Sequence, residues 1–219
     1  SQRLVRDQRY RPLRRIWREL RESPLLTLEA RMLALPIADL PTLYEQWCAL
    51  SVAEALLDGG TAVVAQSLLA EDTARERWTV QLSTAAPLLE LQSGGQTWRL
   101  RYQPRYTSRP DRLGLVALDA YTRIPDLVLE QIAPDRPPSL VVFDAKYRRA
   151  PDNRVPQDAL DDAYAYRGSI GQHSGSAVRY AAILYPHHGP AEDFGSVGAV
   201  PLLPQHTTAL RSLLQKLMR

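Results

Sequence analysis

The sequence predicts a mixed α/β fold in which helices pack on a central β-sheet. Three observations support this prediction. Apolar residues recur at helical spacing over residues 42–58, they alternate with polar residues between 77 and 103, and they run almost unbroken through 139–147 and 179–186. The chain has 219 residues, of which 45% are hydrophobic and 23% charged. These values fit one domain of ordinary size with a small extension.

Residues 1–38 are expected to form an arginine-rich helical extension ahead of a domain spanning 39–219. Apolar residues between 10 and 35 are spaced as in a helix, and Pro24 divides them into two helices. The first 21 residues hold eight arginines, at positions 3, 6, 9, 11, 14, 15, 18 and 21. Such a segment can bind phosphates, dock a partner, or present a solvated helical face, and these three interpretations remain open.

The first helix of the domain is predicted over 42–58. Thr42 and Glu45 have the spacing of a capping box, and Gly59 and Gly60 end the helix. Cys48, the single cysteine, lies on the apolar side and is expected in the core. One cysteine excludes an internal disulfide and a zinc site built from several cysteines, and it favours a cytoplasmic setting.

The remaining elements alternate between strands and helices. Residues 93–96, SGGQ, have the composition of a hairpin turn, and residues 133–138, APDRPP, that of a second turn. The predicted strands are 77–82, 88–92, 97–103, 113–121, 124–132, 139–147, 179–186 and 197–202, and the later helices are 155–170 and 205–218.

The most informative stretch is LVVFDAKYRRA, residues 140–150. An apolar run typical of a central strand ends in Asp144 and Lys146, whose side chains share a face because residues i and i+2 of a strand point the same way. Lysine occurs only at 146 and 216, whereas the other 25 basic residues are arginine, so a compact ammonium is favoured at 146. Taken alone, the pair could also be a surface ion pair at a strand end.

Asp126 lies eighteen residues before Asp144, directly after Pro125. If the two strands pair as a hairpin, both carboxylates converge at one end of the sheet. Two close carboxylates repel each other, and a divalent cation such as Mg²⁺ relieves that repulsion. A lysine beside the cation can orient water and stabilise charge on a phosphate. These residue types favour phosphodiester hydrolysis over acyl transfer, since no serine elbow or histidine lies near them in the sequence.

Pro125-Asp126 followed by Asp144-Ala145-Lys146 at the end of an apolar strand resembles the signature of the PD-(D/E)XK nuclease superfamily. The resemblance implies a restriction-endonuclease-like core, here with an added β-hairpin region and the N-terminal helical extension. It also implies that Asp126, Asp144 and the carbonyl of Ala145 hold the metal and that Lys146 is the catalytic lysine. Glu45 on the first helix is the candidate that completes the metal site, with Glu54 second.

Many members of the superfamily carry a Gln-x-x-x-Tyr motif on the helix that follows the strand with the catalytic lysine, and the helix predicted over 155–170 resembles it. Here Asp162 stands where Gln or Lys is usual, and Tyr166 matches. Together with LYEQWC, TRIPDLVLE and AILYP, this resembles the nuclease subunit of McrBC-type modified-cytosine restriction systems, over roughly residues 40–186. The Asp162 departure puts the role of this helix in question. Arg148, Arg149, Arg167 and Tyr166 are the candidates for contacting DNA.

Several alternatives stand beside these assignments. Glu45 could serve only as the capping-box residue, and Tyr166 and Arg167 could be ordinary helix-surface residues. Pro110-Asp111 competes with Pro125-Asp126 but is followed by a poorer strand. His187-His188 resembles a zinc pair, although no cysteine or spaced carboxylate accompanies it.

The residues together with this resemblance imply a Mg²⁺-dependent endonuclease of double-stranded DNA, with Mn²⁺ able to substitute, in a restriction or phage-defence system. An NTPase motor subunit and a second copy of the chain are the further partners that this interpretation allows, and no membrane is expected to be involved. The alternative is a catalytically silent module of the same fold that binds DNA or docks a motor subunit.

Overall fold

The computed structural model describes residues 40–72, 77–148 and 154–218. Its centre is an eight-stranded sheet with strand order β1-β4-β5-β7-β8-β11-β13-β12. β8 pairs in parallel with β11, and β11 in parallel with β13, whereas the other neighbours are antiparallel, so the sheet is mixed. The strands are β1 Ala62–Gln66, β4 Leu89–Ser93, β5 Gln96–Tyr102, β7 Leu127–Ala133, β8 Arg136–Ala145, β11 Val178–Tyr185, β12 Glu192–Asp193 and β13 Val197–Pro201.

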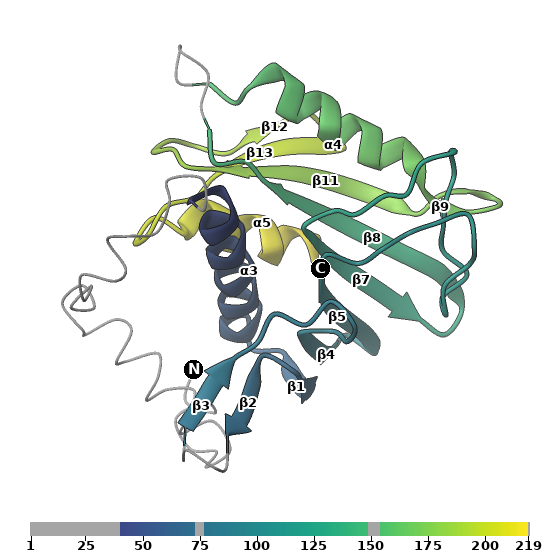
Figure 1. Ribbon diagram of the computed structural model, residues 1–219, viewed down its shortest axis with the longest axis horizontal. Coiled ribbons are helices and arrows are strands. Elements are labelled where there is room, and N and C mark those ends of the chain that lie inside the picture. The colour runs from purple at the N-terminus through teal and green to yellow at the C-terminus, as the bar shows by residue number, and fades with distance from the viewer. Residues whose placement is uncertain (1–39, 73–76, 149–153, 219) are drawn as a thin grey trace.

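Helices cover both faces of this sheet (Figure 1). α3 (Leu40–Asp58) and α5 (Thr208–Leu217) pack on one face, and α4 (Gln157–Ser169) packs on the other. Small pairs complete the described structure: β2 (Leu69–Asp72) with β3 (Arg77–Val80), and β9 (Ile170–Gln172) with β6 (Val116–Ala117) and β10 (Gly175–Ser176). Among the described residues, no helix has the length and apolar character that crossing a membrane requires.

β8 lies between β7 and β11 in the middle of the sheet, as its unbroken apolar run predicted. Val141 and Phe143 join the core beneath α3 and α5, whereas Leu140 and Val142 join the core beneath α4. Asp144 lies on the same face of β8 as Leu140 and Val142, because alternate residues of a strand share a face. The strand therefore carries Asp144 towards α4.

Most predicted elements are confirmed within a few residues, but two loops differ. Only Val116–Ala117 of the predicted strand 113–121 is a strand. The Asp111 carboxylate accepts hydrogen bonds from the amides of Leu113 and Leu115, at 2.8 and 2.9 Å, and Gly114 has a φ of +73°. This side-chain-capped turn replaces the first half of the expected strand.

The predicted turn over 133–138 is also shorter than expected, because β7 reaches Ala133 and β8 begins at Arg136. Pro137 and Pro138 lie within β8. They are tolerated there because β11 joins β8 only from Leu140 onward, so this end of β8 has an open side that needs no amide donor. β1, β2, β9, β10 and β12 were not predicted, and the two helices expected within 10–35 lie outside the described residues.

Candidate active site

The β7–β8 hairpin brings Asp126 and Asp144 together. Leu127 pairs with Phe143, so the next position outward sets Asp126 opposite Asp144. Opposed residues of an antiparallel pair point to the same face. The Ala145 amide donates a hydrogen bond to Asp126 Oδ2 at 2.7 Å, which fixes that carboxylate against the end of β8. The convergence that the eighteen-residue spacing predicted is therefore present.

Asp144 is almost fully removed from water, and Asp126 is partly buried. Asp144 is 4% exposed. Burial, reinforced by the charge of Asp144, raises the pKa of Asp126 to about 7, against the opposing effect of the Ala145 amide. Burial also raises the pKa of Asp144, although Lys146 partly offsets it. A pair of buried, mutually repelling carboxylates needs either a proton or a cation to be accommodated.

Lys146 is shared between two carboxylates. Its Nζ lies 2.8 Å from Asp144 Oδ2 and 3.0 Å from Asp162 Oδ2 of α4. Burial disfavours the charged form, but the two carboxylates outweigh burial and raise the pKa of Lys146. The side chain is therefore a firmly charged ammonium at neutral pH, suited to stabilising negative charge.

Glu45 lies in the first turns of α3 and accepts a hydrogen bond from Gln103 Nε2 at 2.8 Å. Its charge contributes to raising the pKa of both Asp126 and Asp144. The capping-box interpretation is wrong, because the helix already begins at Leu40 and Thr42 lies inside it. Glu54, the second candidate, forms an ion pair with Arg211 of α5 at 3.1 Å.

The donor set fits a hard divalent cation. Asp144 Oδ2 is buried and has no hydrogen-bond partner among the described residues, and its contact with the Lys146 ammonium is an ion pair. Within the described ranges, no three His, Cys, Asp or Glu side chains are grouped to hold a metal together, so Glu45 does not join the two aspartates as a direct third ligand here. Mg²⁺ commonly uses one or two carboxylates and keeps several waters, which Asp126 and Asp144 can satisfy.

The predicted DNA-contacting residues lie on or near α4. The Tyr166 hydroxyl donates to the carbonyl of Ile124 at 3.4 Å, and Arg148 forms an ion pair with Asp158 at 2.5 Å. Arg167 is half-buried, and its Nε has no hydrogen-bond partner among the described residues. Arg149 lies outside the described residues.

The competing motifs have structural partners of their own. Asp111 caps the turn at 113–115, as described above. His188 packs edge-on against His206 with ring centroids 4.6 Å apart, and His187 stacks on Tyr185.

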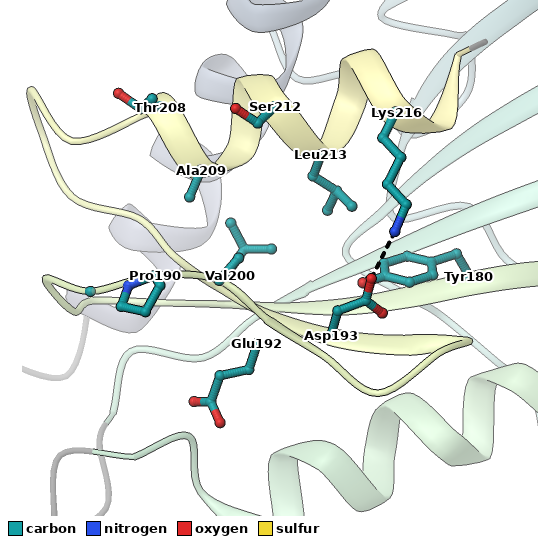
Figure 2. Close-up of a pocket in the computed structure, with 12 residues that line it drawn as sticks. Tyr180, Pro190, Glu192, Asp193, Val200, Thr208, Ala209, Ser212, Leu213 and Lys216 are labelled. Carbon is teal, nitrogen blue, oxygen red and sulfur yellow. Dashed lines mark hydrogen bonds and ion pairs between the residues drawn. The ribbon is translucent and has the colours of Figure 1, made fainter.

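A hollow of about 470 Å³ lies between α5 and the β12–β13 edge, where Lys216 reaches Asp193 at 2.8 Å (Figure 2). Both partners of this pair are well exposed. None of the predicted site residues lines this hollow. The candidate active site is therefore a separate place, at the paired aspartates.

Gln103 was missed by sequence reasoning. Its amide N–H donates to the carbonyl of Asp126 at 2.8 Å and its side chain holds Glu45, so it links β5, β7 and α3. Its φ of +43° is rare for a residue other than glycine. No local signal in the sequence indicates either property, because both depend on segments far apart in the chain.

The central mixed sheet with helices on both faces is a restriction-endonuclease-like fold, with the opposed aspartates and the lysine at the end of its middle hairpin. A family model described as the PD-(D/E)XK nuclease superfamily matches residues 42–190, which is more than half of the chain. The chain belongs to this superfamily of nucleases, whose members typically use divalent metals. A comparison with curated proteins and one with solved structures gave no match.

The raised pKa of Asp126 predicts how stability depends on pH without metal. Because the folded-state pKa of about 7 exceeds the unfolded value of about 3.9, the native protein binds more protons between these limits. The free energy of unfolding should therefore fall as pH rises from about 4 to 7, by on the order of 2–4 kcal/mol for Asp126. Asp144 acts in the same direction.

Urea unfolding at about pH 5 and pH 8 in a chelator measures this effect. The Asp126→Asn variant should show a flatter dependence on pH. Greater stability of the original protein at pH 8 than at pH 5, or the same slope in the variant, would contradict the assignment of the buried pair.

Proposed function

We propose that this chain is a Mg²⁺-dependent endonuclease that hydrolyses phosphodiester bonds of double-stranded DNA in a restriction or phage-defence system, with Mn²⁺ able to substitute. The opposed pair of Asp126 and the buried Asp144, with the Lys146 ammonium beside it, carries this proposal. Membership of the nuclease superfamily supports the reaction class.

The metal would be held by Asp126, Asp144 and the backbone carbonyl of Ala145. Glu45, which accepts a hydrogen bond from Gln103, would add negative charge near the metal without binding it directly. Such an ion polarises a phosphate oxygen and lowers the pKa of water. Lys146 stays protonated and stabilises the negative charge that develops on the phosphate. Because its pKa is raised, its electrostatic role is favoured over that of a general base.

Cutting of supercoiled plasmid DNA tests the proposal. The protein should nick or linearise the plasmid with Mg²⁺ or Mn²⁺ and not with a chelator. The alternative, a silent module that binds DNA or docks an NTPase motor, predicts no cutting and no metal-dependent stabilisation. A true metal site should raise the free energy of unfolding by about 2.7 kcal/mol at a metal concentration of 100 times Kd.

Arg105 is a further candidate for a DNA contact. It is exposed, and it lies two residues after Gln103, which contacts both Asp126 and Glu45 of the proposed site. Arg105→Ala should weaken metal-free DNA binding and reduce the slope of log K against log salt by about 0.9, the loss expected for one phosphate contact. Fluorescence anisotropy over a salt series measures both quantities.

Arg136→Ala is the matched control. Arg136 is also exposed, but it begins β8 eight residues before Asp144, roughly 27 Å away along an extended strand. Equal salt slopes for the two variants would show that Arg105 has no special place in the DNA interface.

A further inference from the structure

One row of side chains on α4 faces the residues that follow β8 and precede β7. Asp158, Asp162 and Tyr166 recur every four residues, so they lie in one row on the helix. Asp158 contacts Arg148 at 2.5 Å, Asp162 contacts Lys146 at 3.0 Å, and Tyr166 donates to the carbonyl of Ile124 at 3.4 Å. Asp162 is the middle member and the one that reaches the site.

Close packing of α4 on the sheet brings Asp162 within reach of Lys146. Ala159 and Ala163 are buried against the sheet, and small side chains there let α4 approach β8 and β11. Asp162 itself is about half exposed, whereas Asp144 is almost fully buried. The two carboxylates that share Lys146 thus differ: one is a predicted metal ligand, and the other belongs to the surface of α4.

A divalent cation bound at this site would compete with Lys146 for Asp144. The ammonium lies 2.8 Å from Asp144 Oδ2, so a metal held by Asp126 and Asp144 would share the Asp144 carboxylate with it. If Asp144 were its sole partner, Lys146 would oppose metal binding and, once displaced, would have no carboxylate to hold it near the phosphate. Asp162 supplies a second carboxylate within reach of the same ammonium.

We propose that Asp162 is a positioning residue that retains Lys146 beside the active site when a metal takes Asp144. The ammonium is transferred from a position shared by both carboxylates to Asp162 alone, with no proton transfer and no change in net charge. This inference rests on the proposed metal-dependent nuclease site and gives a role to the residue that departs from the Gln-x-x-x-Tyr pattern.

Metal binding to the Asp162→Asn variant tests the proposal. The concentration of Mn²⁺ that gives half of the maximal thermal stabilisation should rise about tenfold, the lower end of the effect expected for a residue that supports a metal site from outside. Single-turnover cleavage at saturating metal should also slow. Each variant is compared with its own metal-free melting temperature, which removes any general change in stability.

Asp161→Asn is the matched control, because it removes the same charge from the neighbouring position of α4. Asp161 is exposed and forms no ion pair within the described part of the chain. Its half-saturating concentration should change by no more than about twofold, as expected for a surface charge. Asp162→Glu, which keeps the carboxylate, should restore part of the loss.

A double-mutant cycle separates positioning of Lys146 from direct attraction of the metal. Asp162→Asn should have a much smaller effect when Lys146 is already alanine. The same tenfold change in both backgrounds, or no difference between Asp162→Asn and Asp161→Asn, would overturn the positioning role.

Asp144→Asn identifies a failure of the underlying site. If it leaves metal stabilisation intact, the proposed nuclease site itself is wrong. If it abolishes metal stabilisation while Asp162→Asn behaves as its control, only the role of Asp162 fails.

Discussion

Replacement of Lys146 by alanine is expected to lower the rate of DNA cleavage about 10²–10⁴-fold, the range for loss of a preorganised charge or proton-transfer group in an active site. The physical reason is that Lys146 is a charged ammonium beside the buried carboxylates, and its raised pKa keeps it charged over the working range of pH. Among the residues that the structure describes, Lys146 is the cation that forms an ion pair with Asp144. Single-turnover cleavage at saturating metal and DNA measures the effect.

Lys216→Ala is the control for this variant, since Lys216 is the other lysine of the chain and forms an exposed ion pair with Asp193 on α5's side of the sheet. It should cleave like the original protein. Cleavage by Lys146→Ala at an unchanged rate would remove Lys146 from the mechanism.

Asp144→Asn is expected to have opposite effects on activity and on metal-free stability. Activity should fall by at least about 10³-fold, because a metal ligand is lost and with it several kcal/mol of charge stabilisation. Stability at pH 8 without metal should stay the same or increase. The raised pKa of Asp144 means that its surroundings favour the neutral form, which the amide imitates in shape and charge.

Urea unfolding in a chelator and plasmid cleavage in Mn²⁺ test the two halves of this prediction on the same preparation. A variant that loses activity because it is poorly folded would unfold at lower urea. A variant that keeps cutting would show that Asp144 holds no metal. Active sites are commonly less stable than they could be because function requires strained or charged groups. A loss of activity together with unchanged or higher stability is what this trade-off predicts for Asp144→Asn.

The β8 strand shows how far the sequence determined this site. Its apolar residues on both faces predicted a central strand, and the i, i+2 spacing predicted that Asp144 and Lys146 share a face. Asp126 could be placed opposite because a hairpin needs only local information: two strands and a turn between them. The same local reasoning placed the turn at 93–96, where Gly94 and Gly95 adopt positive φ values.

What the sequence did not show depends on contacts between distant segments. Gln103 reaches Glu45 across 58 positions of the chain, and nothing near residue 103 indicates it. Asp162 was noticed only as a departure from a motif, and its ion pair with Lys146 required the packing of α4 on the sheet. Pro137 and Pro138 were assigned to a turn because the open side of β8 is a property of the sheet and not of the local sequence.

The most direct test is an anomalous difference map from a crystal soaked in Mn²⁺. We expect a strong peak bonded to carboxylate oxygens of both Asp126 and Asp144, with Lys146 displaced from Asp144 and still paired with Asp162. A fully soaked crystal with no peak between the two aspartates, and with Lys146 still bound to Asp144, would contradict the claim that this pair is the metal centre of a nuclease.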